Sequence, residues 1–109
     1  MTSIVLAYML FGSKSLSLED ERDRLELLLG VNFEARESVY RGGSYFRANG
    51  SASESLLLRH NFDILDKEVY EPAFSDCTIL LLVNETARSD VFLQALGGSG
   101  FDLLRCEYI

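Results

Sequence analysis

Residues 78–83 read TILLLV. It is a continuous apolar run, as expected of a central strand that is covered on both faces. A chain with such a strand needs further strands beside it and helices packed on the sheet. The sequence on both sides of residues 78–83 supplies these elements.

A short helix and a closing strand follow the apolar run. The helix is predicted to begin between residues 86 and 89 and to end at Gly97 and Gly98, where glycine allows the chain to turn. Residues 101–108 form the last predicted strand. The apolar side chains that this helix presents are Val91, Phe92, Ala95 and Leu96.

Residues 17–30 contain the clearest helix. Ser17 can cap its first turn, which is rich in acids that complement the positive end of the helix dipole. Gly30 supplies the left-handed residue that ends it. The leucines at positions 18, 25, 28 and 29 share one face. Two i,i+4 ion pairs are expected on the solvated side, Asp20–Arg24 and Arg22–Glu26.

Period-two alternation predicts a meander of strands after this helix. Residues 31–40 alternate between a buried row and a solvent-facing row. The glycines at 42 and 43 turn the chain into a second strand at residues 44–48. The Asn49–Gly50 pair is a strong turn signal before a third strand at residues 54–60. An earlier apolar run, residues 3–11, is predicted to be the first strand, with a helical turn as the alternative.

The predicted order of elements is β-α-β-β-β-β-α-β. It describes an α+β fold with an antiparallel or mixed β-sheet and two helices packed on it, broadly of the split β-α-β kind. At 109 residues the chain can bury one core but not two, so residues 1–109 are predicted to form a single domain.

Charge and cysteine content restrict the partner and the compartment. A net charge of −7 argues against nucleic acid or an anionic membrane as the main partner, because both require a basic patch. It favours a basic protein partner, or serves solubility alone. The two cysteines, Cys77 and Cys106, are interpreted as free, buried thiols in a reducing compartment, although a bridge is possible if their strands are neighbours. Residues 3–11 are too short to span a membrane and lack the basic start of a signal peptide, so the protein is expected to be cytoplasmic.

Residues 61–76, NFDILDKEVYEPAFSD, form an unusually long connection between two predicted strands. Five acids and one lysine give this acidic segment a charge of −4, and aromatic and aliphatic side chains lie between them. A connection of this length is usually functional or disordered, and its apolar content argues against disorder. We expect Ile64, Leu65 and Phe74 to anchor it to the core, and Tyr70 to be the natural contact residue.

No catalytic, metal or cofactor site is predicted. His60 is the only histidine, and no nucleophile–base pair can be assembled around it from local spacing. Its spacing to Cys77 and Cys106 matches no zinc pattern, and the acidic segment lacks the glycine and glutamate positions of an EF-hand loop. The sequence therefore indicates a protein that is not an enzyme.

Three short motifs carry a resemblance to a known family. They are RGGSYF at residues 41–46, HNFD at residues 60–63 and EPAF at residues 71–74. On these motifs, residues 30 to 83 resemble small cytosolic immunity proteins encoded beside bacterial contact-dependent growth inhibition and other polymorphic toxins. The resemblance implies a non-enzymatic acidic protein that forms a heterodimer with a cognate toxin domain, often a basic nuclease, and occludes its active site.

The toxin contacts implied by this role lie mostly in the acidic segment. Each carboxylate would pair with a toxin lysine or arginine, while a tyrosine fills a pocket. The alternative hypothesis is a small-ligand-binding regulatory domain of split β-α-β type that dimerises through its sheet, suggested by the solvent-facing row of residues 31–40. An enzyme built on His60 is a third. The predicted toxin-binding residues are Asp63, Asp66, Glu68, Tyr70 and Glu71, followed by Tyr40 and Tyr45 near the double glycine.

Overall fold

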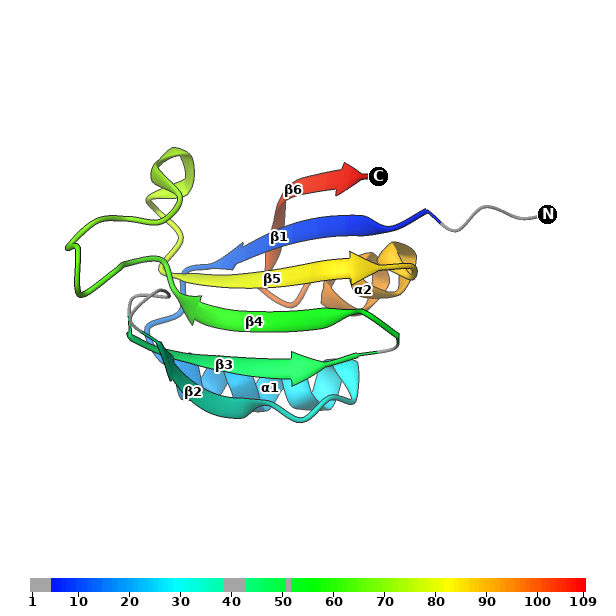
Figure 1. Ribbon diagram of the computed structural model, residues 1–109, viewed down its shortest axis with the longest axis horizontal. Helices are drawn as coiled ribbons and strands as arrows, with labels where there is room; N and C mark the ends of the chain where they lie inside the picture. Colours follow the sequence, from blue (N-terminus) through cyan, green and yellow to red (C-terminus); the bar gives the residue numbers. More distant parts are fainter. Residues whose placement is uncertain (1–4, 39–42, 51) are drawn as a thin grey trace.

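The computed structural model describes residues 5–38, 43–50 and 52–109, and these residues form one β-sheet with two α-helices behind it (Figure 1). The strands lie in the order β2-β3-β4-β5-β1-β6, and every neighbouring pair is antiparallel. The predicted element order and α+β class are confirmed, and of the two predicted sheet types the antiparallel one is found. The elements are β1 (Ala7–Ser13), α1 (Leu18–Leu29), β2 (Glu34–Ser38), β3 (Gly43–Asn49), β4 (Ser55–His60), the 3-10 turn η2 (Pro72–Phe74), β5 (Ile79–Thr86), α2 (Ser89–Leu96) and β6 (Asp102–Tyr108).

All of the apolar run at residues 78–83 except Thr78 lies in β5, which is between β4 and β1 in the sheet. Alternate residues of β5, such as Leu81, point into the core between the sheet and the helices. The next residue, Leu80, lies on the opposite face and is nevertheless fully buried. The prediction of a central strand is therefore confirmed. The main core contains Phe11, Leu25, Phe46, Leu58, Ile79, Leu81, Phe92 and Leu96.

The connections explain how two helices cover one face. Strands β5 and β6 both run antiparallel to β1, so they are parallel to each other with β1 between them. This is a split β-α-β unit, with α2 as the crossover. The chain from β1 passes through α1 to β2 at the far edge and returns as the meander β2-β3-β4-β5. The predicted meander is thus confirmed and continues by one strand.

Local signals set the ends of α1 as predicted. The Ser17 Oγ accepts a hydrogen bond from the Asp20 amide at 3.2 Å. Gly30 adopts φ 67°, and its amide donates to the Glu26 carbonyl at 3.0 Å. Because glycine pays no steric penalty at positive φ, the helix ends there.

The two predicted i,i+4 ion pairs of α1 are wrong. Arg24 binds Glu21 at 2.8 Å, and Arg22 binds its neighbour Asp23 at 3.0 Å. The cause is tertiary: Glu21 is buried, and the Arg24 Nη1 also donates to the Ser99 carbonyl at 2.6 Å. Arg24 therefore joins α1 to the connection between α2 and β6.

The predicted apolar face of α1 contains one leucine that the core does not cover. Leu18 and Leu25 are buried and Leu29 packs against the core, but Leu28 is exposed.

An ion pair between the buried Glu54 and the partly exposed Arg88 links two connections of the sheet. Arg88 donates to the Glu54 carboxylate through Nη2 at 2.7 Å and through Nε at 3.0 Å. The Thr86 hydroxyl donates to the same carboxylate at 2.6 Å. Since Glu54 precedes β4 and Arg88 precedes α2, the pair joins the β3–β4 connection to the β5–α2 connection.

Candidate functional site

The acidic segment is an ordered loop held by one buried amide. The Asn61 Nδ2 donates to the carbonyls of Phe74 at 3.1 Å and Cys77 at 3.0 Å. Its Oδ1 accepts from the Glu71 amide at 2.9 Å. Asn61 thus binds the loop at three places and fixes its path after β4. The segment also contains η2, so it is more structured than its sequence indicated.

A tight turn at residues 63–68 forms the tip of this loop. The Asp63 amide donates to the Glu68 carbonyl at 2.7 Å. The Asp63 carboxylate accepts from the amides of Leu65 at 2.8 Å and Asp66 at 3.0 Å. Lys67 has φ 57°, the left-handed conformation that closes the turn. We call residues 63–68 the tip turn.

The tip turn exposes two aliphatic side chains. Ile64 is 62% exposed and Leu65 is 54% exposed, so the prediction that both anchor the loop in the core is wrong. The physical reason is that Asn61 and Asp63 hold the loop through polar bonds to the backbone. Phe74, the third predicted anchor, is half-buried, as is Val69.

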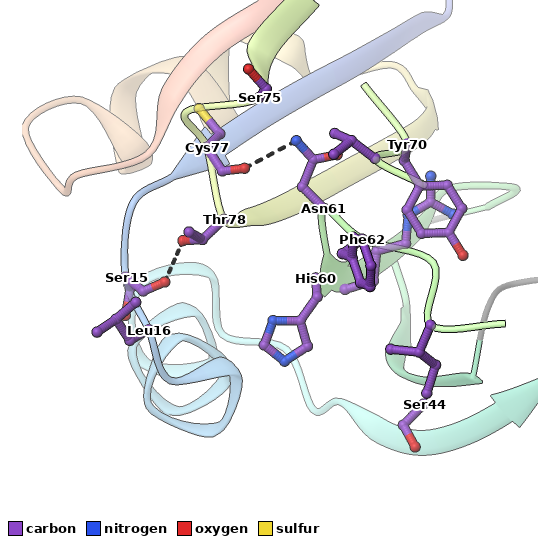
Figure 2. Close-up of a pocket in the computed structure, with 13 residues that line it drawn as sticks. Ser15, Leu16, Ser44, His60, Asn61, Phe62, Tyr70, Ser75, Cys77 and Thr78 are labelled. Carbon is purple, nitrogen blue, oxygen red and sulfur yellow. Dashed lines mark hydrogen bonds between the residues drawn. The ribbon is translucent and has the colours of Figure 1, made fainter. Parts of the chain in front are cut away.

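A largely apolar pocket of about 500 Å³ lies between this loop, the end of β4 and the connection from β1 to α1. Figure 2 shows Leu16 on one side of it, His60 and Phe62 in the middle, and Tyr70 and Ser44 on the other side. Hydrogen bonds from Thr78 to the carbonyls of Ser13 and Ser15 hold the β1–α1 connection in place. The pocket is therefore bounded by segments that are far apart in the sequence.

Tyr70 lies in the wall of this pocket. The Arg59 guanidinium stacks on its ring, 3.8 Å from the centroid. The phenol oxygen is buried and has no hydrogen-bond partner among the described residues. Burial raises the pKa of this phenol, and the negative charge of Asp63 raises it further. The hydroxyl therefore stays protonated well above neutral pH and can donate a hydrogen bond.

The predicted contact carboxylates divide into two groups. Glu71 is bound to Arg105 of β6 at 2.9 Å. Asp63 has its structural role in the tip turn. Asp66 and Glu68 are exposed, and neither has an ion pair within the described chain. These two are the carboxylates available to a partner.

Of the two secondary candidates, the structure describes only Tyr45. Tyr45 is buried, at 8% exposure. Tyr40 falls outside the described residues. Neither prediction gains support as a contact residue.

Two exposed apolar side chains at the pocket were not singled out from the sequence. Leu16 is 88% exposed and Phe62 is 44% exposed. The sequence around Leu16 could have predicted that its side chain is exposed. An apolar residue just before a helix cap usually packs on the fourth helical residue, but that residue in α1 is Glu21. Leu16 therefore has no staple partner and remains exposed.

The geometry shows no arrangement suited to catalysis or metal binding in the described part of the chain. His60 is exposed at the end of β4. No group of three or more histidine, cysteine or acidic side chains lies close enough to hold a metal within the described ranges. Cys77 and Cys106 are both free. Among residues 5–38, 43–50 and 52–109, no helix has the length and apolar character to cross a membrane.

Asn61→Ala is expected to lower the free energy of unfolding by about 2–3 kcal/mol, because the carbonyls and amide that it binds lose a partner. Loss of the Asn61 side-chain hydrogen bonds should also increase amide hydrogen exchange across residues 62–76 while β5 stays protected. Urea denaturation and hydrogen-exchange mass spectrometry measure the two effects. Asn32→Ala, at an exposed position before β2, is the matched control. Unchanged exchange in the loop would contradict the role assigned to Asn61.

Comparisons with protein-family models, with curated proteins and with solved structures find no match to this chain.

Proposed function

We propose that this protein is an immunity protein that binds a cognate toxin domain through the tip turn and the adjoining pocket. The observation that carries the proposal is a preorganised turn that presents Ile64 and Leu65 beside two exposed carboxylates, Asp66 and Glu68. Exposed apolar side chains gathered at one place mark interaction surfaces, and Phe62 and Leu16 extend the group to the pocket.

The arrangement suits tight and rapid binding to a basic protein. Apolar side chains at the centre of an interface supply most of its affinity. Carboxylates at its margin attract a positively charged partner and orient it during encounter. Because Asn61 and Asp63 already order the loop, less entropy is lost on binding.

A nuclease is the kind of toxin that fits this charge. Its active-site groove must be positive to hold phosphates, so an acidic surface can occupy the groove in place of the nucleic acid. The acidic segment contributes −4 of the net −7. Glu71 and Asp76 pair with Arg105 and Lys14, whereas the exposed Asp66 and Glu68 have no ion pair among the described residues. Inhibition would then follow from occlusion of that groove.

The test is complex formation with the toxin domain encoded next to this protein. The double variant Asp66→Lys/Glu68→Lys is expected to reduce the association rate at least tenfold at low ionic strength, with a smaller effect at high salt. Stopped-flow or surface plasmon resonance measures the rate. Glu71 is left intact because its replacement would break the pair with Arg105.

The control reverses the same number of charges elsewhere. Glu19→Lys/Asp90→Lys changes two exposed acids at the starts of α1 and α2. It should alter the rate much less, since neither residue lies at the tip turn. Equal slowing by both double variants would mean that overall charge alone acts, and the tip turn would be excluded from the interface.

A small-ligand-binding regulatory domain is the second candidate, and the pocket favours it. Its volume of about 500 Å³ lies within the range of about 300–1,000 Å³ that is usual for ligand sites. A metabolite that binds the folded state should raise the melting temperature. A thermal-shift screen with no hit, alongside a stable complex with the toxin domain, would decide for the immunity role.

A further inference from the structure

The pocket combines apolar walls with a buried donor. Leu16, Phe62 and Ile64 line it and remain substantially exposed, so burial by a partner would be favourable. The Tyr70 hydroxyl lies buried in the wall without a hydrogen-bond partner among the described residues. A buried donor without a partner is costly, and an incoming carbonyl oxygen would satisfy it.

The charge beside the pocket is negative. Asp63 lies between two pocket residues, Phe62 and Ile64. Asp66, Lys67 and Glu68 follow on the same turn, so the tip turn carries three acids and one lysine, a net charge of −2. Arg59 is engaged against the Tyr70 ring. The side of the pocket formed by the tip turn therefore suits a cation next to an apolar group.

We infer that the pocket receives a short segment of the toxin in which a large apolar side chain is followed by lysine or arginine. The apolar side chain packs against Phe62 and Ile64, the preceding carbonyl accepts from the Tyr70 hydroxyl, and the cation lies beside the carboxylates of the tip turn. This inference rests on the proposed function and names the chemistry of the toxin epitope.

Capped dipeptides test the preference without the toxin. N-acetyl-Phe-Arg-amide is expected to shift the amide NMR signals of Phe62, Tyr70 and Thr78. It should bind about fivefold more tightly than N-acetyl-Phe-Glu-amide, because the charge beside the pocket is exposed to solvent. It should bind more than tenfold more tightly than N-acetyl-Gly-Arg-amide, which has no side chain to bury.

A variant in which a larger side chain fills the pocket tests whether the peptides bind there. Ser75 is exposed and lines the pocket, so Ser75→Phe should occupy the space and abolish the shifts. Ser53→Phe, on the exposed connection between β3 and β4, should leave them unchanged. Equal binding of the three peptides, shifts confined to other surfaces, or full binding to the filled variant would each overturn the inference.

The two proposals fail in different ways. If the peptides bind as expected but the neighbouring toxin domain does not, the immunity role fails and the pocket preference stands. If Asp66→Lys/Glu68→Lys weakens the toxin complex while no peptide binds, the immunity role stands and the pocket inference fails.

Discussion

Arg88→Ala is expected to lower the free energy of unfolding by about 3 kcal/mol, the cost of leaving a buried charge without its partner. The Glu54 side chain is only 1% exposed, and two nitrogens of Arg88 hold its carboxylate. The hydrogen bond from Thr86 comes from a neutral hydroxyl and does not neutralise the charge. Since the free energy of unfolding of a small domain is about 5–15 kcal/mol, this loss is a large part of the total stability. Urea denaturation at neutral pH measures it.

Arg36→Ala is the matched control for this prediction. Arg36 binds Glu34 at 2.8 Å, close to the 2.7 Å between Arg88 and Glu54, but both side chains of the Arg36 pair are about half or more exposed. An exposed pair is worth about 0–1 kcal/mol, so this variant should be nearly as stable as the parent protein. Similar losses in the two variants would show that burial of Glu54 is not what makes the Arg88 contact important.

The double variant Ile64→Ala/Leu65→Ala is expected to weaken toxin binding by about 100-fold. That factor corresponds to about 1.4 kcal/mol from each side chain, which is typical of apolar residues buried at the centre of an interface. Stability should change by less than about 0.5 kcal/mol, because both side chains are exposed in the free protein. Isothermal titration calorimetry and urea denaturation measure the two quantities.

Leu27→Ala/Leu93→Ala removes two exposed leucines from the helices and serves as the comparison. These side chains lie on α1 and α2, which cover the back of the sheet, whereas the tip turn projects beyond the end of the strands (Figure 1). Toxin affinity should therefore stay unchanged. A loss of affinity as large as that of the tip-turn variant would place the interface on the helices instead.

Local patterns were sufficient to predict the elements of this fold. Ser17 and Gly30 act on α1 through hydrogen bonds that span one turn of chain, so sequence spacing alone identifies them. The apolar composition of β5 likewise indicates, without any other part of the sequence, that this strand is buried. The antiparallel pairing of β1 with β6 was not predictable, because it depends on contacts between the two ends of the sequence.

The candidate site was predictable in its location but not in its geometry. The charge and length of the acidic segment indicated a binding loop. Apolar composition suggested that Ile64 and Leu65 would be inside, whereas side-chain bonds from Asn61 and Asp63 place them outside. Hydrogen bonds from side chains to the backbone of a loop produce no periodic pattern in the sequence. For the same reason, the pairing of Glu71 with Arg105 was not foreseen.

The place of β1 in the sheet has a consequence for biosynthesis. As a ribosome makes this chain, β1 emerges first, yet its two neighbours are β5 and β6. Met9 pairs with Val83 on one side and with Cys106 on the other. Neither edge of β1 can therefore be paired until most of the sequence has been synthesised. Contacts of such long sequence separation slow folding. The meander β2-β3-β4 can form while translation continues, but the full sheet can assemble only after β6 has been synthesised and can pair with β1.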